Sequence, residues 1–151
     1  MTRGVTPFKV VVDCADPHRM AAFWSEALGY VVEDNGPLIR RLLDAGRIGE
    51  GDVERAGDGY RFARAAAVRN PEDAFDDATG IGRGGRILFQ AVPEPKTVKN
   101  RVHLDLHVGP DRRDAEVARL TALGARVLWE GEQGGRWTTM ADPEGNEFCV
   151  A

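Results

Sequence analysis

Three side chains that can bind metals or carry protons alternate along one short stretch, residues 101–108. His103, Asp105 and His107 occupy every second position there. Apolar side chains fill the positions between them: Val102, Leu104, Leu106 and Val108. This period of two predicts a β-strand with one apolar and one polar face. An exposed face would more often carry lysine, glutamate or threonine, so we interpret the polar row as the lining of a pocket, with candidate catalytic residues. An exposed strand face that happens to carry histidines is the alternative.

The composition limits the partners that we expect. A chain of 151 residues fits one compact domain, or two very small ones that share a core. A net charge of −4 without a basic stripe argues against nucleic acid as a partner. No apolar run reaches the length of a membrane span, and Met1–Thr6 lacks the apolar core of a signal peptide. We therefore expect a cytoplasmic protein whose cysteines, Cys14 and Cys149, are reduced thiols.

Other strands and helices must position these side chains, and the first of these elements lie at the start of the chain. Residues 8–14 alternate like a strand, and Asp16-Pro17 follows as a helix N-cap with proline at the first helical position. Apolar residues then recur at helical spacing, which predicts an amphipathic helix: Met20, Phe23, Trp24, Ala27 and Leu28. Gly29 is predicted to cap this helix, and Tyr30 to begin the next strand.

The same order recurs after residue 101. A strand to Val108 is followed by Gly109-Pro110-Asp111, which opens a helix, and Gly124 closes it before a strand over 125–129. Lys9 lies seven residues before Asp16 and His103 seven before Pro110, an offset of 94, and Gly29 and Gly124 differ by 95. The constant offset predicts an internal duplication and hence two similar halves.

The two halves end alike but differ in length. We predict strands over 137–140 and 147–150, joined by a tight turn at 142–146, and a matching final strand over 86–92. The first half carries about 36 additional residues between Glu33 and Gly85, because 61 positions separate Gly29 from Gln90 and 25 separate Gly124 from Cys149. Within them we predict a helix over 37–45, one strand over 60–67, and a flexible glycine turn at 80–85, where a GxGxxG pattern precedes a strand and not a helix.

Three motifs carry a resemblance to a known superfamily. They are the opening strand–Asp16-Pro17–helix–Leu28-Gly29, the HLDLHV stretch and the closing DPEGNEFCV. Together they resemble the vicinal oxygen chelate superfamily, within it the glyoxalase-like, bleomycin-resistance-like group of bacteria, with residues 89–108 especially similar. The resemblance implies an α+β fold of two fused βαβββ modules, with a cleft between curved mixed sheets, commonly in a homodimer. We expect a single domain over 1–151: an N-terminal module over 7–93 with an insertion in roughly 34–85, and a C-terminal module over 100–151.

The resemblance also implies positions for a metal site. In metal-dependent relatives four equivalent strand positions hold a divalent cation, and here they fall on Lys9, Gln90, His103 and Cys149, of which only His103 keeps the usual ligand type. Lysine has no lone pair when charged, and two charges about 4 Å apart cost roughly 4 kcal/mol at an effective dielectric near 20. Residues two apart on a strand lie about 6.6 Å apart, so the polar row should not converge on one ion. We expect no metal or other cofactor; a divalent metal, if bound, would be held by His103 with Gln90 or Cys149.

Without a metal, the same positions predict a pocket for an anionic or carbonyl-bearing small molecule. The candidate ligand-binding residues are Lys9, Gln90, His103, Asp105, His107, Trp137 and Cys149. His103 or His107, held by Asp105, could act as a general base. Cys149 could be a nucleophile if its pKa is lowered, or a small buried apolar residue; Trp137 could form the floor of the cleft or lie in the core.

We expect structural or minor roles for other notable residues. Cys14 and Trp24 are predicted to lie in the core, Trp129 in the core or a dimer contact, and His18 at an exposed position without a role. Residues 93–101 are expected to be a hinge whose basic side chains could close over an anion. The predicted function is a small-molecule-binding glyoxalase-like protein without the metal quartet. Alternatives are a metal-dependent lyase, isomerase or dioxygenase that uses His103, and a resistance-type protein that sequesters a drug or metabolite without turnover.

Overall fold

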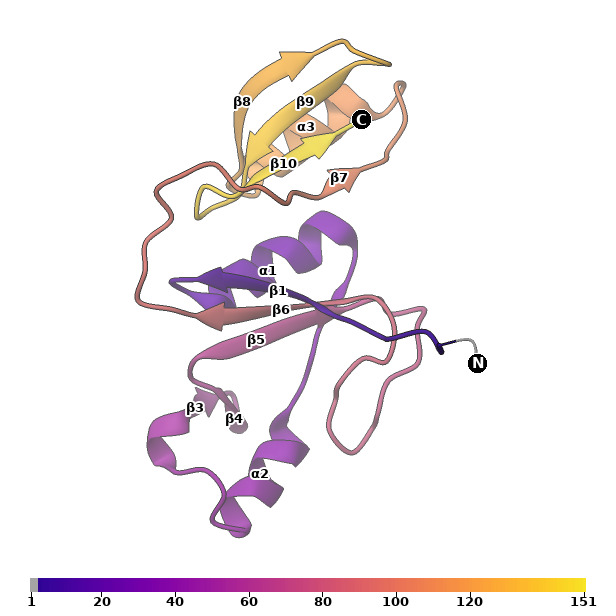
Figure 1. Cartoon of the computed structure of the whole chain (residues 1–151). Coiled ribbons are helices and arrows are strands. Elements are labelled where there is room, and N and C mark those ends of the chain that lie inside the picture. Colours follow the sequence, from indigo (N-terminus) through magenta and orange to yellow (C-terminus); the bar gives the residue numbers. More distant parts are fainter. Residues whose placement is uncertain (1–2) are drawn as a thin grey trace. The chain divides into compact units, whose positions relative to one another are not determined.

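The computed structural model of the chain describes residues 3–151; Met1 and Thr2, part of the segment considered for a signal peptide, lie outside it. The chain divides into two units, the first ending at Val92 and the second running from Pro93 to Ala151 (Figure 1). None of the helices in the described residues has both the length and the apolar character that a membrane crossing requires.

The first unit contains a four-stranded mixed sheet. Its strands are β1 (Val10–Cys14), β2 (Val31–Val32), β5 (Ala65–Arg69) and β6 (Arg86–Ala91), in the spatial order β1-β6-β5-β2. β1 and β6 are parallel, and the other neighbours are antiparallel. The helix α1 (Pro17–Leu28) follows β1 and packs on β5 and β6 (Figure 1).

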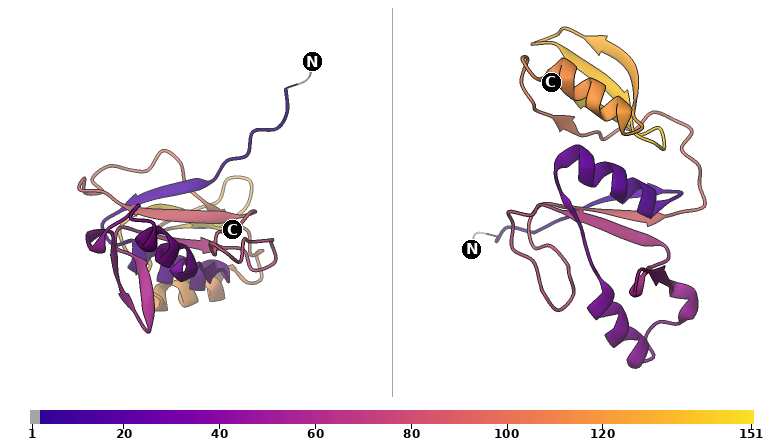
Figure 2. Two further views of the ribbon diagram at one scale, coloured as in Figure 1. Left: turned by 90° about the horizontal axis from the view of Figure 1, so that it is seen from below. Right: turned by 180° about the vertical axis from the view of Figure 1, so that it is seen from behind.

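The second unit repeats this topology. Its elements are β7 (Asp105–Leu106), α3 (Arg113–Ala122), β8 (Arg126–Gly131), β9 (Trp137–Ala141) and β10 (Glu147–Val150). The spatial order is β7-β10-β9-β8, with β7 parallel to β10 and the remaining pairs antiparallel. α3 covers one face of this sheet (Figure 2). The predicted α+β fold of two βαβββ modules is confirmed.

Helix α1 forms where its sequence signals place it. The Asp16 carboxylate accepts a hydrogen bond from the Arg19 N–H at 3.1 Å, and Pro17 begins the helix. Gly29 ends it with a φ of 68°, a left-handed conformation that suits glycine. The apolar stripe is buried, and Trp24 lies in the core as predicted, with its ring edge-on to Phe23 at 5.3 Å.

The additional residues of the first unit form a helix and a hairpin. α2 (Gly36–Asp44) matches the predicted helix, and the 3₁₀ helix η1 (Glu50–Asp52) leads into the hairpin of β3 (Val53–Ala56) and β4 (Gly59–Phe62). The single strand predicted over 60–67 is wrong. The chain breaks after Phe62, because Tyr60 and Phe62 pair with β3 while the residues from Ala65 onward join the main sheet.

The glycines at 80–85 form a packed turn and not the flexible one predicted. Gly80 has a φ of 76°, and a Cβ there would lie 1.9 Å from the Asp34 carbonyl oxygen. The Gly82 N–H donates to the buried Glu33 carboxylate at 2.8 Å, and Arg86 donates two further hydrogen bonds to it at 2.7 Å. This buried ion pair fastens the turn to the edge of the sheet.

The strand predicted over residues 101–108 is much shorter than expected. Only Asp105 and Leu106 pair with β10, although the Leu104 carbonyl also accepts the Cys149 N–H at 2.9 Å. Leu106 is buried as the alternation predicts, but Val102 is 84% exposed. The chain before Leu104 therefore leaves the sheet, which changes the positions of its side chains.

Candidate functional site

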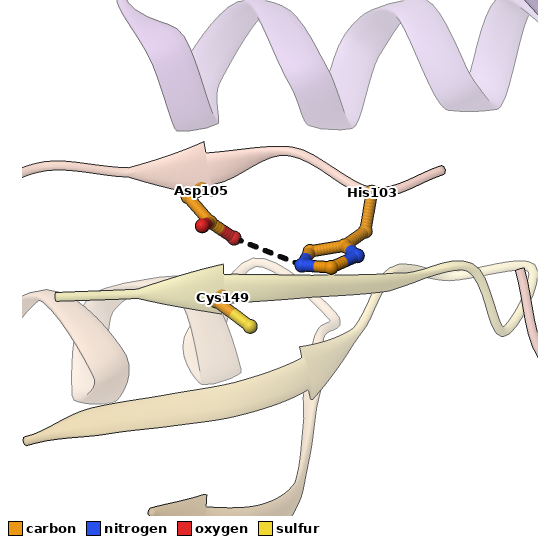
Figure 3. A group of neighbouring side chains, drawn as sticks. All are labelled: His103, Asp105 and Cys149. Carbon is orange, nitrogen blue, oxygen red and sulfur yellow. Dashed lines mark ion pairs between the residues drawn. The ribbon is translucent and has the colours of Figure 1, made fainter. Parts of the chain in front are cut away.

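The imidazole of His103 and the carboxylate of Asp105 form a pair. His103 Nε2 lies 3.2 Å from Asp105 Oδ1, and Figure 3 shows the two side chains turned toward each other. The prediction that side chains of the polar row would not converge is wrong for this pair, whose side-chain atoms meet although the residues are two positions apart and His103 precedes β7. The predicted interaction between Asp105 and a histidine is therefore present, and it involves His103.

Cys149 reaches the same place from the neighbouring strand. β10 pairs with β7 so that Cys149 lies beside Asp105, and with β9 so that it lies beside Thr139. The Thr139 hydroxyl oxygen is 3.4 Å from the Cys149 sulfur. One donor atom each from His103, Asp105 and Cys149 lies within 4.8 Å of the others.

The Cys149 sulfur is a thiol in these surroundings. Burial raises its pKa, and the adjacent Asp105 carboxylate raises the pKa further, while the hydrogen bond with Thr139 and the charge of Lys99 oppose the shift. A nucleophilic role for Cys149 required a lowered pKa, and this condition is not met. In the protein without a metal, Cys149 is a half-buried hydrogen-bonding group.

A cavity of about 490 Å³ opens beside this cluster. Two tryptophans line it, of which Trp129 is 46% exposed and therefore not in the core; its alternative role as a dimer contact stays a prediction. The Trp137 ring is half-buried and lies directly against Gly131, where an added Cβ would be 2.1 Å from the ring. The glycine therefore gives the indole its position on the cavity wall.

Two basic and two acidic side chains line the cavity: Lys99, Arg136, Asp105 and Glu147. Glu147 is held by Lys96 at 3.2 Å and by the Asn100 N–H at 2.9 Å. Burial disfavours its charged form, but these hydrogen bonds outweigh burial and lower the pKa of Glu147 below its ordinary value. Residues 93–101, expected to be a hinge, begin the second unit; they contribute Lys99 to the cavity, and Lys96 and Asn100 anchor them to Glu147 of β10.

The other predicted site residues lie elsewhere. His107 is exposed and does not line the cavity. In the first unit, Lys9 precedes β1, whereas Gln90 pairs with Asp13, four residues further along. At about 3.3 Å per residue, Lys9 and Asp13, the residue that pairs with Gln90, are about 13 Å apart along the strand, so the backbone does not place Lys9 beside Gln90.

Strand register also identifies which residues of the two units are equivalent. Asp13 pairs with Gln90 as Asp105 pairs with Cys149, so the position equivalent to His103, two residues earlier, is occupied by Val11. Counting from Asp16 points to Lys9 instead, because the strand–helix connection is shorter in the first unit than in the second. The valine side chain at this position has no atom that could bind a metal or form a hydrogen bond.

Sequence reasoning missed most of the remaining lining residues: Gln133, Gly134, Gly135, Arg136, Thr139 and Glu147. Thr139 had a usable signal, since it lies two positions after Trp137 on a predicted strand and therefore on the same face. The tip of the β8–β9 hairpin had no such signal, because its place in the cavity lining depends on the tertiary structure.

The donor set fits one divalent ion. An imidazole nitrogen, a carboxylate oxygen and a sulfur are the three ligand types of protein zinc sites, and three protein ligands leave a position open for water or substrate. All three residues belong to the second unit. Lys9 and Gln90 are not needed to complete this set.

Comparisons with known proteins agree with this fold. The fosfomycin resistance protein FosX from Mesorhizobium loti aligns with a TM-score of 0.59 and 11% identity over 99% of this chain and 91% of that one. A glyoxalase/bleomycin resistance protein/dioxygenase family enzyme from Burkholderia phytofirmans aligns with 0.56 and 17% over 94% of each. A mutant FosX from Listeria monocytogenes, complexed with Mn(II) and 1S,2S-dihydroxypropylphosphonic acid, aligns with 0.56 and 14% over 99% and 90%.

No curated protein matches the sequence. The family described as "Glyoxalase-like domain" matches residues 9–151, which is nearly the whole chain. The solved structures described above include an enzyme of the glyoxalase/bleomycin resistance/dioxygenase family, which agrees with the resemblance in the three sequence motifs. The chain belongs to the glyoxalase-like domain family of the vicinal oxygen chelate superfamily.

Proposed function

We propose that this protein binds a small organic molecule in the cavity of its second unit. The observation that carries the proposal is the lining of that cavity, to which two tryptophans and the His103–Asp105–Cys149 cluster all contribute. A volume of about 490 Å³ falls within the range of small-molecule sites, which are mostly apolar with a few convergent polar groups. The lining of this cavity has both an apolar part and convergent polar groups.

The lining indicates the chemistry of the ligand. Trp129 and Trp137 offer flat apolar surfaces for an aromatic or alkyl body. Arg136 and Lys99 offer donors to an anionic or carbonyl group, and the Glu147 carboxylate is already engaged by Lys96 and Asn100. A molecule with an apolar body and one carboxylate, phosphonate or carbonyl group suits this lining. Lys9 and Gln90 stay predicted ligand-binding residues of the first module.

Without a metal, the cluster can move one proton. The Asp105 carboxylate lies 3.2 Å from the His103 imidazole and orients it, so His103 is placed to accept a proton from a bound acid or alcohol. Cys149 remains a thiol and can donate a hydrogen bond to the ligand. A protein that lacks turnover would use the same groups for recognition alone, which is the sequestration alternative.

A second candidate function is a metal-dependent enzyme. The convergence of three donor atoms in the cavity favours it, and one solved neighbour of the same fold is a complex with Mn(II). His103, Asp105 and Cys149 would hold the ion, which would act as a Lewis acid on an oxygen of the bound molecule. The chain's own part would be to orient that molecule between the two indoles and to exclude water. Activity that survives a chelator would remove this candidate.

The test is a binding screen read by tryptophan fluorescence and thermal melting. Carboxylates, phosphonates and aldehydes with aromatic or alkyl bodies would be tested against the wild type, Trp137→Ala and His103→Gln. His107→Gln is the matched control, because this histidine is exposed and outside the cavity. We expect both cavity variants to weaken a hit at least about tenfold and the control to leave it unchanged. A hit that all three variants bind like the wild type would refute the proposed site.

Two further expectations accompany this function. We infer a homodimer, as the family resemblance implies, and we keep the expectation of a cytoplasmic protein. Analytical ultracentrifugation at micromolar concentration tests the first, and fractionation of the cells that express the protein tests the second.

A further inference from the structure

We propose that the first unit holds a second small-molecule site, a cavity of about 670 Å³ that binds a zwitterionic molecule of the α-amino acid type. The cavity lies between helices α1 and α2, strand β4 and the start of β5. It shares no lining residue with the cavity of the second unit, so the inference is independent of the function proposed above.

The additional residues of the first unit form one wall of this cavity. α2 packs against β4, and β4 in turn contacts β5 of the main sheet (Figure 1). The second unit, which the structure describes throughout, repeats α1 and the sheet but has no counterpart of α2 or of the hairpin of β3 and β4. The module fold therefore forms without these elements, whereas the cavity requires them.

Small and aromatic side chains give the cavity an apolar part. Ala21 of α1 and Ala66 of β5 are buried, and their short side chains leave room beside them. Tyr60 and Phe62 are two residues apart on β4 and therefore lie on the same face of that strand. The apolar body of a ligand can pack against these rings and methyl groups.

Three polar atoms converge at Gly36, the first residue of α2. A Cβ at this glycine would lie 3.1 Å from Asp34 Oδ1, 3.9 Å from Arg40 Nη1 and 3.9 Å from the Tyr60 carbonyl oxygen. The absence of a side chain thus leaves a space that is bounded by a carboxylate, a guanidinium and a carbonyl group. Asp34 Oδ1 also accepts the Gly36 N–H at 2.9 Å, which leaves the second carboxylate oxygen for a ligand.

The charges of Asp34 and Arg40 are not neutralised within the protein. In the part of the chain that the structure describes, neither side chain forms an ion pair, although both reach the space at Gly36. Two other charged residues of the lining, Glu33 and Arg61, are each held in an ion pair at 2.7 Å. The unpaired charges beside Gly36 are therefore one negative and one positive group.

These groups complement a zwitterion. The Asp34 carboxylate and the Tyr60 carbonyl can accept hydrogen bonds from an ammonium group, and the Arg40 guanidinium can donate two to a carboxylate. In an α-amino acid both charged groups are attached to one carbon, so both can occupy the space at Gly36 while the side chain packs against the aromatic rings of β4. A ligand with a single charge would leave either Asp34 or Arg40 without a partner.

The experiment is isothermal titration calorimetry of the full-length protein with L-phenylalanine and L-leucine. Each amino acid has two analogues with the same apolar body, the amine that lacks the carboxylate and the acid that lacks the ammonium group. We expect at least one of the two amino acids to bind at one site per chain. Its analogues should bind at least about tenfold more weakly, because each lacks one set of charged hydrogen bonds.

Variants of the first unit locate the site. Arg40→Gln and Asp34→Asn should each weaken binding at least about tenfold, and the asparagine oxygen can still accept the Gly36 N–H. Gly36→Ala puts a methyl group into the space between the three polar atoms and should weaken binding as well. Arg41→Gln and Asp44→Asn are the matched controls, because these residues lie on the same helix but do not line the cavity.

The wild-type titrations decide the proposal even if a variant folds poorly. No binding of either amino acid at millimolar concentration would overturn it, and so would an analogue that binds as tightly as its parent amino acid. Affinity unchanged in Arg40→Gln and in Asp34→Asn would also overturn it. Trp137→Ala should leave amino-acid binding intact, and a loss of binding in this variant alone would assign the ligand to the second unit and overturn the first-unit site.

Discussion

Gly131→Ala should move the Trp137 ring away from the cavity wall. The added Cβ would lie 2.1 Å from the ring, whereas ordinary contacts begin near 3.4 Å, so the indole must retreat by about 1.3 Å. The backbone of Gly131 is not in the left-handed region, and alanine fits it without strain. The effect of the substitution is therefore a steric one, confined to a single aromatic contact.

The size of the effect follows from where the ring lies. Overpacking a closed core costs about 1–3 kcal/mol, but Trp137 is half-buried beside a cavity and can yield, so we expect about 1 kcal/mol of lost stability. Loss of the aromatic wall should weaken an apolar ligand by about 1 kcal/mol, or roughly fivefold.

The assay is tryptophan emission and acrylamide quenching in a Trp129→Phe background. Trp24 is buried and so contributes a constant signal. We expect red-shifted, more easily quenched emission in Gly131→Ala, together with weaker binding of the anionic aromatic dye 1-anilinonaphthalene-8-sulfonate. Gly109→Ala is the control, because its φ of 87° makes alanine strained while nothing lies within 4 Å of the new Cβ and the residue does not line the cavity. It should lower the melting temperature without changing the emission. Unchanged emission and dye binding in Gly131→Ala would refute the assigned position of the ring.

Three further predictions concern stability. Glu33→Gln breaks a buried ion pair with Arg86 and should lower the free energy of unfolding, measured by urea denaturation, by about 3–5 kcal/mol. Much of this loss should be recovered in the double variant Glu33→Gln/Arg86→Met. A loss below about 1 kcal/mol would contradict the presence of the buried ion pair. The hydrogen bond from Arg119 lowers the pKa of Glu116 against the opposing effect of burial. The contact between Glu116 and Arg119 therefore stabilises the fold at pH values above the unfolded pKa near 4.3, and this stabilisation is lost as pH falls through the folded pKa. Glu116→Gln should therefore cost about 0.5 kcal/mol at pH 7 and almost nothing at the lowest pH at which the protein stays folded, and an equal loss at both would refute this cause. Glu147→Gln weakens the contacts with Lys96 and Asn100 and should speed tryptic cleavage after Lys96 or Lys99, whereas Glu144→Gln should not.

Much of the fold could be predicted because its signals are local. The N-cap at Asp16, the left-handed glycine at position 29 and the apolar stripe of α1 act within a few residues of one another, and each was found where expected. The duplication was visible for the same reason, since each module repeats its own local signals. The hairpin of β3 and β4 was missed because it depends on which partner strand pairs with Tyr60 and Phe62.

The candidate site was only partly visible in the sequence. Alternation by itself identified His103 and Asp105 as one polar row, and family resemblance added Cys149. Only the tertiary structure decided that these three converge, because that depends on where β7 begins and on its parallel register with β10. The same register showed that Val11 and not Lys9 is the counterpart of His103. Spacing along a chain determines the face on which a side chain lies, and pairing between strands determines which side chains meet.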